Sequence, residues 1–327
     1  MTGAAIAGVG TALPARAVTS SELEDELGLE RGWIAGRTGI ESRRIASASD
    51  SVSTLGAAAA RSAVRAAGIS PSEIDYVIVA TTTPDFALPA AASLLQDALG
   101  CDGGAFDLSA GCSGFLVGLA QADALVRAGS ARHVLVAGVD LMSRIVDSSD
   151  PKTGILFGDG AGAAVVSEAP APALGPFVLH SDGSRPDLLM AARDGKVVMA
   201  GREVYRRAVQ EMSSSVAEVL ALAGASLDDV DLVVAHQANA RILAAVAERL
   251  GVAPGKVFTN IGRYGNTSAA SIPLALEEAH ACGELKDGAR VVVTAFGAGF
   301  VWGACLLHWT APRAGASTYE ATGAALV

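Results

Sequence analysis

The sequence has no long run of lysine and arginine and no long uninterrupted apolar run. Its 24 lysines and arginines are outnumbered by 34 aspartates and glutamates, so the formal net charge is −10 over 327 residues. A chain this acidic is a poor candidate for sequence-independent nucleic-acid binding, and any basic binding surface must be local. Gly, Asp, Arg or Ser interrupts each apolar stretch before the roughly 18 residues that a membrane span requires. The sequence therefore predicts neither a nucleic-acid partner nor a membrane-embedded protein.

Cysteine is also scarce, and no two cysteines have the CxxC spacing. The four that are present have no nearby histidine pattern: Cys101, Cys112, Cys282 and Cys305. This pattern favours neither a disulfide framework nor a zinc site, so at most one or two of the cysteines carry chemistry. The first residues lack the positive segment that precedes a secretory apolar stretch. We expect a cytoplasmic protein without a metal site.

Apolar residues are abundant, at 51% against 18% charged residues, which is the composition of a folded protein with a large core. Short runs rich in Val and Ile alternate with Ala-rich segments of helical length, a pattern typical of an α/β fold. The expected strands are 4–10, 75–81, 105–108, 133–139, 162–167, 177–182, 231–235, 256–259, 290–296 and 301–308. The expected helices are 53–67, 89–99, 113–128, 202–223, 239–250 and 268–281.

The order of elements repeats after the prolines near residue 170. Segment 67–79 matches 223–234, and 99–136 matches 250–293, at an offset that stays within a few residues of 154. Such a duplication predicts two halves of one topology. The expected parts are an N-terminal half over 1–170, a C-terminal half over 171–312, and a flexible tail without periodicity over 313–327.

Two related halves can each contribute reactive groups to a site between them. At an offset of 154, Cys112 falls on Asn266, and each lies just after a short expected strand and just before an apolar helix. His236 directly follows the strand at 231–235. Because α/β sheets bind ligands at the carboxyl ends of their parallel strands, the sequence predicts that these three side chains share one site.

Cys112 lies in a bend of small residues, 109–114, that opens the following helix. Unpaired N–H groups at a helix N-terminus favour the thiolate, so we expect a pKa below the usual value near 8.5 and a nucleophilic sulfur. Simple packing is the alternative for Cys112, a satisfied core histidine for His236, and a helix N-cap for Asn266. If His236 and Asn266 have a chemical role, both could act as hydrogen-bond donors that hold an oxyanion on a second substrate.

Six ordered segments carry a family resemblance that covers the chain to about Trp309. They are WIAGRTGI at 33–40, FDL at 106–108 with CSGF at 112–115, FGDGAGA at 157–163, HQAN at 236–239, GNTS at 265–268 and FGAGF at 296–300. These segments resemble β-ketoacyl-acyl carrier protein synthase III, of the thiolase superfamily. The resemblance implies an α/β, thiolase-like fold in which two duplicated βαβαβαββ halves form five layers, α-β-α-β-α, and it implies a homodimer.

The resemblance also implies a decarboxylative Claisen condensation that initiates fatty-acid or polyketide synthesis. Cys112 would take the acyl group of a primer acyl-CoA and then receive the enolate formed by decarboxylation of malonyl-acyl carrier protein. His236 and Asn266 would stabilise the enolate oxygen. The backbone N–H groups of Cys112 and Ala298 would form the oxyanion hole, and Phe296 would shape the decarboxylation pocket. No cofactor is implied, because the CoA thioester is a substrate.

By the same resemblance, other positions bind the two substrates. Those that match the CoA and pantetheine tunnel are Trp33, Arg37, Lys152 and Asn239. Those that match a small basic patch for the acidic carrier protein are Arg241 and Arg249.

Three positions depart from the family pattern. Ala298 replaces the middle glycine of a common three-glycine run, and Leu88 stands where a phenylalanine often closes the partner's acyl pocket. Segment 189–198 is short for the loop that caps this pocket. The departures predict a primer that is longer, branched or unusual rather than acetyl, as in polyketide starter enzymes, while a housekeeping role stays equally open.

Two other functions are weighed against condensation. The first is an acyltransferase that moves the acyl group from Cys112 to an alcohol or amine without decarboxylation. Asn266 argues against it, because such variants commonly replace that asparagine. The second is a catalytically silent dimerisation or carrier-docking module, which would usually lack the nucleophile.

Overall fold

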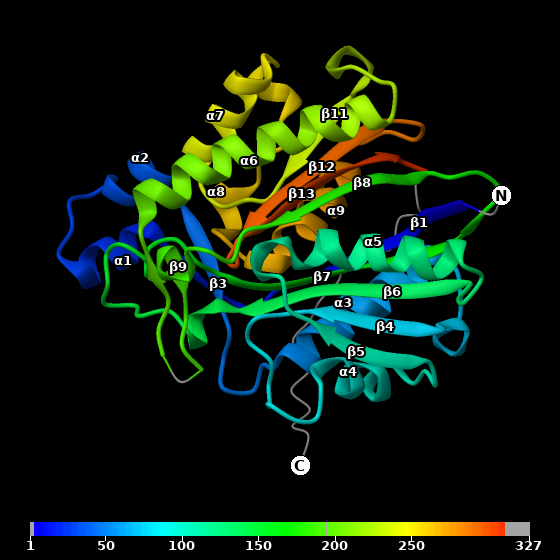
Figure 1. Cartoon of the computed structure of the whole chain (residues 1–327). Coiled ribbons are helices and arrows are strands. Elements are labelled where there is room, and N and C mark those ends of the chain that lie inside the picture. The colour runs from blue at the N-terminus through cyan, green and yellow to red at the C-terminus, as the bar shows by residue number, and fades with distance from the viewer. Residues whose placement is uncertain (1–2, 194, 311–327) are drawn as a thin grey trace.

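Two β-sheets form the centre of the computed structural model, which describes residues 3–193 and 195–310 (Figure 1). The first sheet contains, in spatial order, β1 (Gly3–Ala12), β7 (Asp159–Ala169), β6 (His133–Leu141), β4 (Tyr76–Ala80) and β5 (Gly104–Leu108). The second contains β11 (Leu232–Ala235), β12 (Arg290–Gly297), β13 (Val301–His308) and β8 (Leu174–Ser181). β4 runs parallel to β5 and β6, and β11 runs parallel to β12.

Three layers of helices alternate with the two sheets, one between the sheets and one on each outer face (Figure 1). The central layer is α5 (Gly114–Arg127) with α9 (Ser271–Ala281), the outer layer on the first sheet is α3 (Val52–Ala67) with α4 (Ala91–Leu99), and the outer layer on the second sheet is α6 (Gly201–Leu222) with α7 (Ala240–Leu250). Separate apolar clusters fill the spaces between these layers. Each sheet thus has both faces buried, which explains the continuous Val and Ile runs in its parallel strands. The five-layered, thiolase-like arrangement is confirmed.

Shorter elements connect the layers and border the central pocket. The short strands and helices are β2 (Arg16–Thr19), β3 (Ser42–Ile45), β9 (Leu189–Met190), β10 (Val198–Met199), α1 (Ser20–Leu27), α2 (Trp33–Thr38) and α8 (Ile261–Tyr264). The 3₁₀ turns are η1 (Pro71–Glu73), η2 (Gly111–Ser113), η3 (Met142–Arg144), η4 (Pro186–Leu188), η5 (Leu227–Asp229), η6 (Pro254–Lys256) and η7 (Ser268–Ala270).

Two expected elements differ from the structure. The strand expected at 256–259 is reduced to a bridge between Val257 and Val233 and one hydrogen bond from the Phe258 N–H, because η6 occupies the preceding residues. The second sheet therefore has four strands where the first has five. The helix expected from residue 268 begins at Ser271, since η7 occupies Ser268–Ala270.

Other expectations concern the chain as a whole. Within the described residues, no helix combines the length and apolarity that crossing a membrane requires. The boundary expected near residue 170 falls between β7 and β8, and the division into 1–170 and 171–312 stays a prediction. The tail expected at 313–327 lies outside the described residues.

Candidate active site

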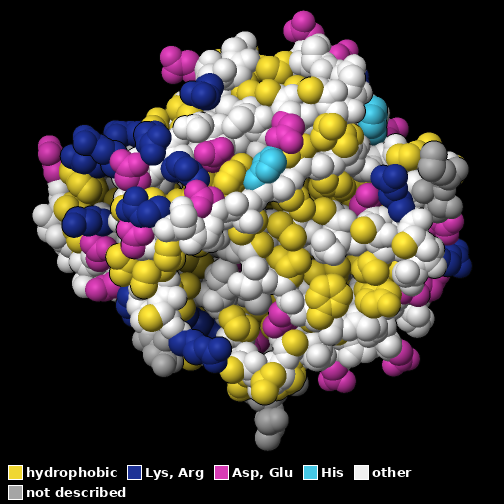
Figure 2. Space-filling model, in the orientation of Figure 1, with side chains coloured by type: hydrophobic (Ala, Val, Ile, Leu, Met, Phe, Trp, Pro, Cys, Tyr) yellow, Lys and Arg dark blue, Asp and Glu magenta, His cyan; other side chains and the backbone are white. Residues whose placement is uncertain are grey.

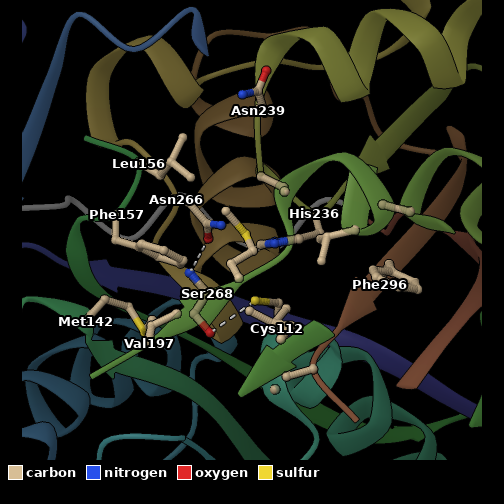
Figure 3. A pocket seen from close by; sticks show the side chains of 18 of the residues that line it. Cys112, Met142, Leu156, Phe157, Val197, His236, Asn239, Asn266, Ser268 and Phe296 are labelled. Carbon is tan, nitrogen blue, oxygen red and sulfur yellow. Dashed lines mark hydrogen bonds between the residues drawn. The ribbon is translucent and has the colours of Figure 1, made fainter. Parts of the chain in front are cut away.

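A pocket of about 710 Å³ takes its walls from both halves of the chain. Most of the residues proposed from the sequence line it: Cys112, His236, Asn266, Phe296, Ala298, Arg37, Lys152, Asn239 and Arg241. Three do not line it, namely Trp33, Leu88 and Arg249. In Figure 3 the side chains of Cys112, His236 and Asn266 point toward one another at one end of this pocket, whereas Asn239 lies at the other end.

Cys112 lies in η2, directly before α5 and after the carboxyl end of β5, so its position in the fold is the one expected. Two glycines let the backbone around it approach Ala298. A Cβ on Gly111 would lie 2.8 Å from the Ala298 nitrogen, and a Cβ on Gly297 would lie 2.6 Å from the Cys112 nitrogen. Any larger residue at either glycine would force these two backbone segments apart.

The expectation of an acidic Cys112 thiol is wrong for the protein without substrate. Burial, the largest cause, and the nearby carboxylate of Asp140 together raise the pKa of Cys112 to about 12, although a hydrogen bond from Ser268 opposes the rise. The loss of solvation around the sulfur therefore outweighs the stabilisation that the start of a helix offers. At neutral pH the resting residue is a thiol, and it becomes nucleophilic only as its proton leaves.

His236 extends the pairing of β11, because its N–H donates to the Thr294 carbonyl at 2.8 Å. The residue is 2% exposed, and burial lowers the pKa of its imidazole to about 4, so the imidazole is neutral at physiological pH. Nδ1 lies 2.6 Å from Oγ of Ser271, which also accepts the Gln237 N–H at 3.4 Å. Because that N–H occupies one lone pair of Oγ, we assign the Ser271 hydroxyl as the donor to Nδ1. Nδ1 is then the unprotonated nitrogen, and Nε2 carries the proton that can be donated toward the pocket.

Asn266 is held between the two halves by its backbone. Its N–H donates to the Leu156 carbonyl at 2.8 Å, and its carbonyl accepts from the Gly158 N–H at 3.0 Å. Its Oδ1 accepts the Ser268 N–H at 2.9 Å, so the carboxamide NH₂ is left to donate into the pocket (Figure 3). Since α9 begins at Ser271, Asn266 is not its N-cap.

Two serines of the same segment contact the proposed catalytic side chains, and sequence reasoning missed both. Ser268 Oγ donates to the Cys112 sulfur at 3.4 Å, and Ser271 Oγ contacts His236. The buried carboxylate of Asp140, next to Ser268, was missed as well. The available signal was their position: Ser268 and Ser271 follow Asn266 within five residues, and Asp140 is a charged residue at the end of a Val-rich strand.

The solvent end of the pocket carries positive charge. Arg37, Lys152 and Arg241 are exposed there, and the Arg37 guanidinium lies 4.2 Å from the centre of the Trp33 ring. Asn239 caps α7, because its Oδ1 accepts the Arg241 N–H at 2.8 Å. Among the described residues, no three His, Cys, Asp or Glu side chains are grouped as a metal site, and the expectation that no cofactor is required stays a prediction.

Comparison with known proteins identifies the family. The sequence pattern of 3-oxoacyl-[acyl-carrier-protein] synthase III matches residues 106–183, and the pattern of its C-terminal part matches 220–309. The β-ketoacyl-[acyl-carrier-protein] synthase III of Erythrobacter litoralis (strain HTCC2594) is 46% identical over 318 residues, which span 94% of this chain and 99% of the relative. The chain belongs to the 3-oxoacyl-[acyl-carrier-protein] synthase III family. The resemblance described from the six segments is therefore confirmed.

Solved structures agree with this assignment. The synthase III of Aquifex aeolicus VF5 superposes with a TM-score of 0.92 at 43% identity. The match covers 94% of this chain and 100% of the Aquifex chain. A priming β-ketosynthase from the R1128 polyketide biosynthetic pathway superposes with a TM-score of 0.90 at 36% identity, covering 95% and 97%. The fold of this chain thus occurs both in a synthase III and in a priming ketosynthase of a polyketide pathway.

Proposed function

We propose that this synthase III joins a primer acyl group from acyl-CoA to the two-carbon unit of malonyl-acyl carrier protein through an acyl-Cys112 intermediate. The observation that carries the proposal is the pocket itself, in which one thiol from the first half faces two neutral donors from the second. A single nucleophile beside two fixed donors suits a reaction that first forms a thioester and then stabilises an enolate.

In the first step the Cys112 sulfur attacks the acyl-CoA thioester carbonyl. The new bond joins Sγ to the acyl carbon, the bond from that carbon to the CoA sulfur breaks, and the thiol proton passes to the departing CoA sulfur. The backbone N–H groups of Cys112 and Ala298 would hold the oxyanion, an assignment supported by their close approach across Gly111 and Gly297. Because these backbone donors are already in position, they need not reorganise as negative charge develops on the carbonyl oxygen.

In the second step malonyl-acyl carrier protein loses carbon dioxide, and the resulting enolate attacks the acyl carbon. The bond from that carbon to Sγ of Cys112 then breaks, the β-ketoacyl-acyl carrier protein leaves, and the sulfur takes up a proton from solvent to become a thiol again. Nε2–H of His236 and the NH₂ group of Asn266 would bind the enolate oxygen. The neutral state of His236 supports this role, because a neutral imidazole donates without adding charge. Phe296, 4% exposed and packed 4.8 Å from Phe300 between ring centres, would supply an apolar wall that favours neutral carbon dioxide over carboxylate.

The substrates would enter from the positively charged end. Arg37, Lys152 and Arg241 are suited to the phosphates of CoA, with Trp33 stacked on Arg37 and Asn239 beside them along the pantetheine arm. Arg249, exposed in the last turn of α7, extends this positive charge toward an acidic carrier protein. Figure 2 shows lysine and arginine side chains gathered on the side of the molecule where α1 and α2 lie.

The apolar lining of one part of the pocket supports a primer larger than acetyl. The hairpin of β9 and β10 forms part of this wall. The apolar residues along this part of the pocket include Met142, Ile145, Phe157, Leu189 and Val197. Such a lining suits a longer or branched chain, since each buried methylene contributes about 0.8 kcal/mol.

The active form would be a homodimer. β5 is an edge strand of the first sheet, and Phe106 on it is 39% exposed. Phe86 and Leu88 are exposed large apolar residues of the same half, and Figure 2 shows apolar side chains gathered over the region of β5. Unpaired strand edges and apolar patches of this kind are commonly covered by a second subunit.

Intact-protein mass spectrometry tests the proposal. Mixing the protein with acetyl-, butyryl-, isobutyryl- and octanoyl-CoA in competition should add acyl mass to Cys112, and Cys112→Ala should remove that addition. Malonyl-acyl carrier protein should then discharge the acyl group with release of one carbon dioxide per turnover. Discharge by an alcohol or amine without carbon dioxide would instead indicate an acyltransferase. No acyl mass would indicate a silent module, and a preference for acetyl-CoA would contradict the larger primer.

A further inference from the structure

A buried carboxylate lies beneath the nucleophile and has no part in the steps described above. Asp140, near the end of β6, is 0% exposed. It belongs to the first half of the chain, yet its Oδ2 accepts the N–H of Ala269, in the second half, at 3.1 Å. A carboxylate is costly to bury, so its hydrogen bonds must compensate for lost hydration.

Three threonines after β4 hold one oxygen of this carboxylate. Thr82 donates to Oδ1 through its N–H at 2.7 Å and its hydroxyl at 2.9 Å. The hydroxyl of Thr81 accepts the Thr83 N–H, and that of Thr83 accepts the Leu141 N–H. Because an ionised carboxylate only accepts hydrogen bonds, both hydroxyls donate to Oδ1 of Asp140, at 3.2 Å from Thr81 and 3.3 Å from Thr83. Oδ1 is thereby saturated, and Oδ2 remains for the second half.

Ser268 connects this carboxylate to the nucleophile. Its Oγ donates to Sγ of Cys112 at 3.4 Å (Figure 3), and its side chain partly offsets the rise that burial causes in the pKa of Asp140. Its backbone has φ of 51°, the one positive value at a non-glycine residue in the described ranges 3–193 and 195–310. A left-handed serine persists only where its surroundings hold it, and such positions cluster at functional sites.

The Ser268 hydroxyl has one proton and two acceptors, a carboxylate oxygen and a sulfur. We propose that Ser268 is a further catalytic residue of this synthase and that Asp140 is its positioning residue. In the free protein the hydroxyl donates to the Cys112 thiol at 3.4 Å. As the thiol proton moves to the departing CoA sulfur, this hydrogen bond strengthens, because the developing thiolate is a better acceptor than the thiol. The hydroxyl proton stays on Ser268, so the atom balance of acyl transfer is unchanged.

The charges around Cys112 agree with this division of roles. Asp140 opposes the thiolate by its charge, whereas the hydrogen bond from Ser268 favours it. His236, the other titratable group beside the sulfur, is neutral. The remaining titratable residues that line the pocket, which include Arg37, Lys152, Tyr205 and Arg241, are exposed and so are screened by solvent. Ser268 is therefore the group best placed to change the thiolate fraction.

The test measures alkylation of Cys112 by iodoacetamide between about pH 7 and 10, where the rate follows the thiolate fraction. It rests on the proposed function only in treating Cys112 as the nucleophile, and it needs neither acyl-CoA nor malonyl substrate. Ser268→Ala and Ser268→Gly should each slow alkylation about tenfold at a given pH, because a hydrogen bond to a charged group is lost. Glycine adopts positive φ without strain, so agreement between the two variants excludes a backbone cause.

Two controls accompany these variants. Ser113→Ala removes an adjacent hydroxyl that donates to the Val301 carbonyl instead of to the sulfur, and it should leave the rate unchanged. The exposed Cys282 provides an internal reference for the reagent in every sample. Wild-type alkylation rates in both Ser268 variants would overturn the proposal, and so would an equal loss in Ser113→Ala.

Asp140→Asn tests the positioning role separately. Removing the negative charge should accelerate alkylation, opposite to the Ser268 variants, because the charge of Asp140 opposes the thiolate whereas the hydrogen bond from Ser268 favours it. Slower alkylation in a folded Asp140→Asn protein would overturn the role of Asp140.

Discussion

Cys112 is a thiol at rest because the protein removes water from its sulfur. The neighbouring side chains then determine when the proton leaves and which charge is stabilised afterwards. His236 is neutral because it is buried, and Asn266 presents its NH₂ because Ser268 occupies its Oδ1. At the scale of single residues, the site is therefore built from neutral donors around a neutral nucleophile.

Asn266→Ala separates the two chemical steps. Acylation of Cys112 should continue at close to the wild-type rate, because Asn266 is assigned to the enolate rather than to the acyl carbonyl. Condensation should fall on the order of 10²- to 10³-fold, the usual effect of removing one oxyanion donor. Acylation is followed by mass spectrometry and condensation by product formation. Unchanged condensation would remove Asn266 from the mechanism.

The lowered pKa of His236 predicts a flat pH dependence near neutrality. Decarboxylation of malonyl-acyl carrier protein by Cys112→Ala, measured between about pH 5 and 8, should show no inflection near the ordinary histidine value of 6.5. Stability should respond differently. As pH falls from 6.5 toward about 4, the unfolded chain binds a proton that the folded chain does not, so His236 lowers the free energy of unfolding.

Chemical denaturation at several pH values measures this second effect. His236→Gln should reduce the slope of stability against pH over the same range, because it removes the titrating group. A decarboxylation profile with an inflection near 6.5 would show that the imidazole is solvated in the working enzyme.

At the scale of elements, one short segment before α9 organises the whole site. Asn266 belongs to it, Ser268 contacts Cys112, and Ser271 at the start of α9 contacts His236. The 3₁₀ turn η7 makes this possible, since a tighter turn aims successive polar side chains at different neighbours. The close contact between η2 and the end of β12 also positions the site. It requires glycine at Gly111 and Gly297.

Gly297→Ala tests that second contact. The added methyl group would lie 2.6 Å from the Cys112 nitrogen and 3.0 Å from that of Ser113, and neither backbone atom can yield cheaply. We expect about 1–3 kcal/mol of destabilisation in thermal unfolding and acylation at least tenfold slower. Gly255→Ala is the matched control, because nothing lies within 4 Å of its added Cβ. Wild-type acylation in Gly297→Ala would show that the oxyanion hole is formed elsewhere.

At the scale of the whole molecule, the pocket exists because two similar halves meet. The first supplies Cys112 and Asp140, and the second supplies His236, Asn266 and Ser268. The first half also carries the apolar surface near β5, which a second subunit is proposed to cover.

Phe106→Arg tests the proposed dimer. A charge on the edge strand should shift the protein toward the monomer in sedimentation velocity, since it would have to be buried in the interface. Leu222→Arg, at a leucine of α6 that is 63% exposed, is the matched control and should leave the assembly unchanged. A monomer in the wild-type protein, or a dimer unaffected by Phe106→Arg, would contradict the proposed interface.

Local pattern in the sequence was sufficient for most elements and for the main site residues. The strand at 301–308 has the same bounds in the structure, and Cys112, His236 and Asn266 line one pocket. Strand and helix periodicities are local properties, and the repeat offset shows which residues occupy equivalent places. The prediction of a strand at 256–259 was wrong because strand pairing is not a local property. A β-ladder requires a paired strand over several residues, and here only Val257 has a bridge partner.

Tertiary structure alone decided the electrostatics and the coupling between distant residues. The start of a helix is visible in the sequence, but the burial that raises the pKa of Cys112 to about 12 depends on everything packed around it. Asp140 and Ser268 are separated by most of the second half of the chain, and no local pattern relates them. Solvation and hydrogen bonding depend on three-dimensional neighbours, so these properties appear only when the two halves are folded against each other.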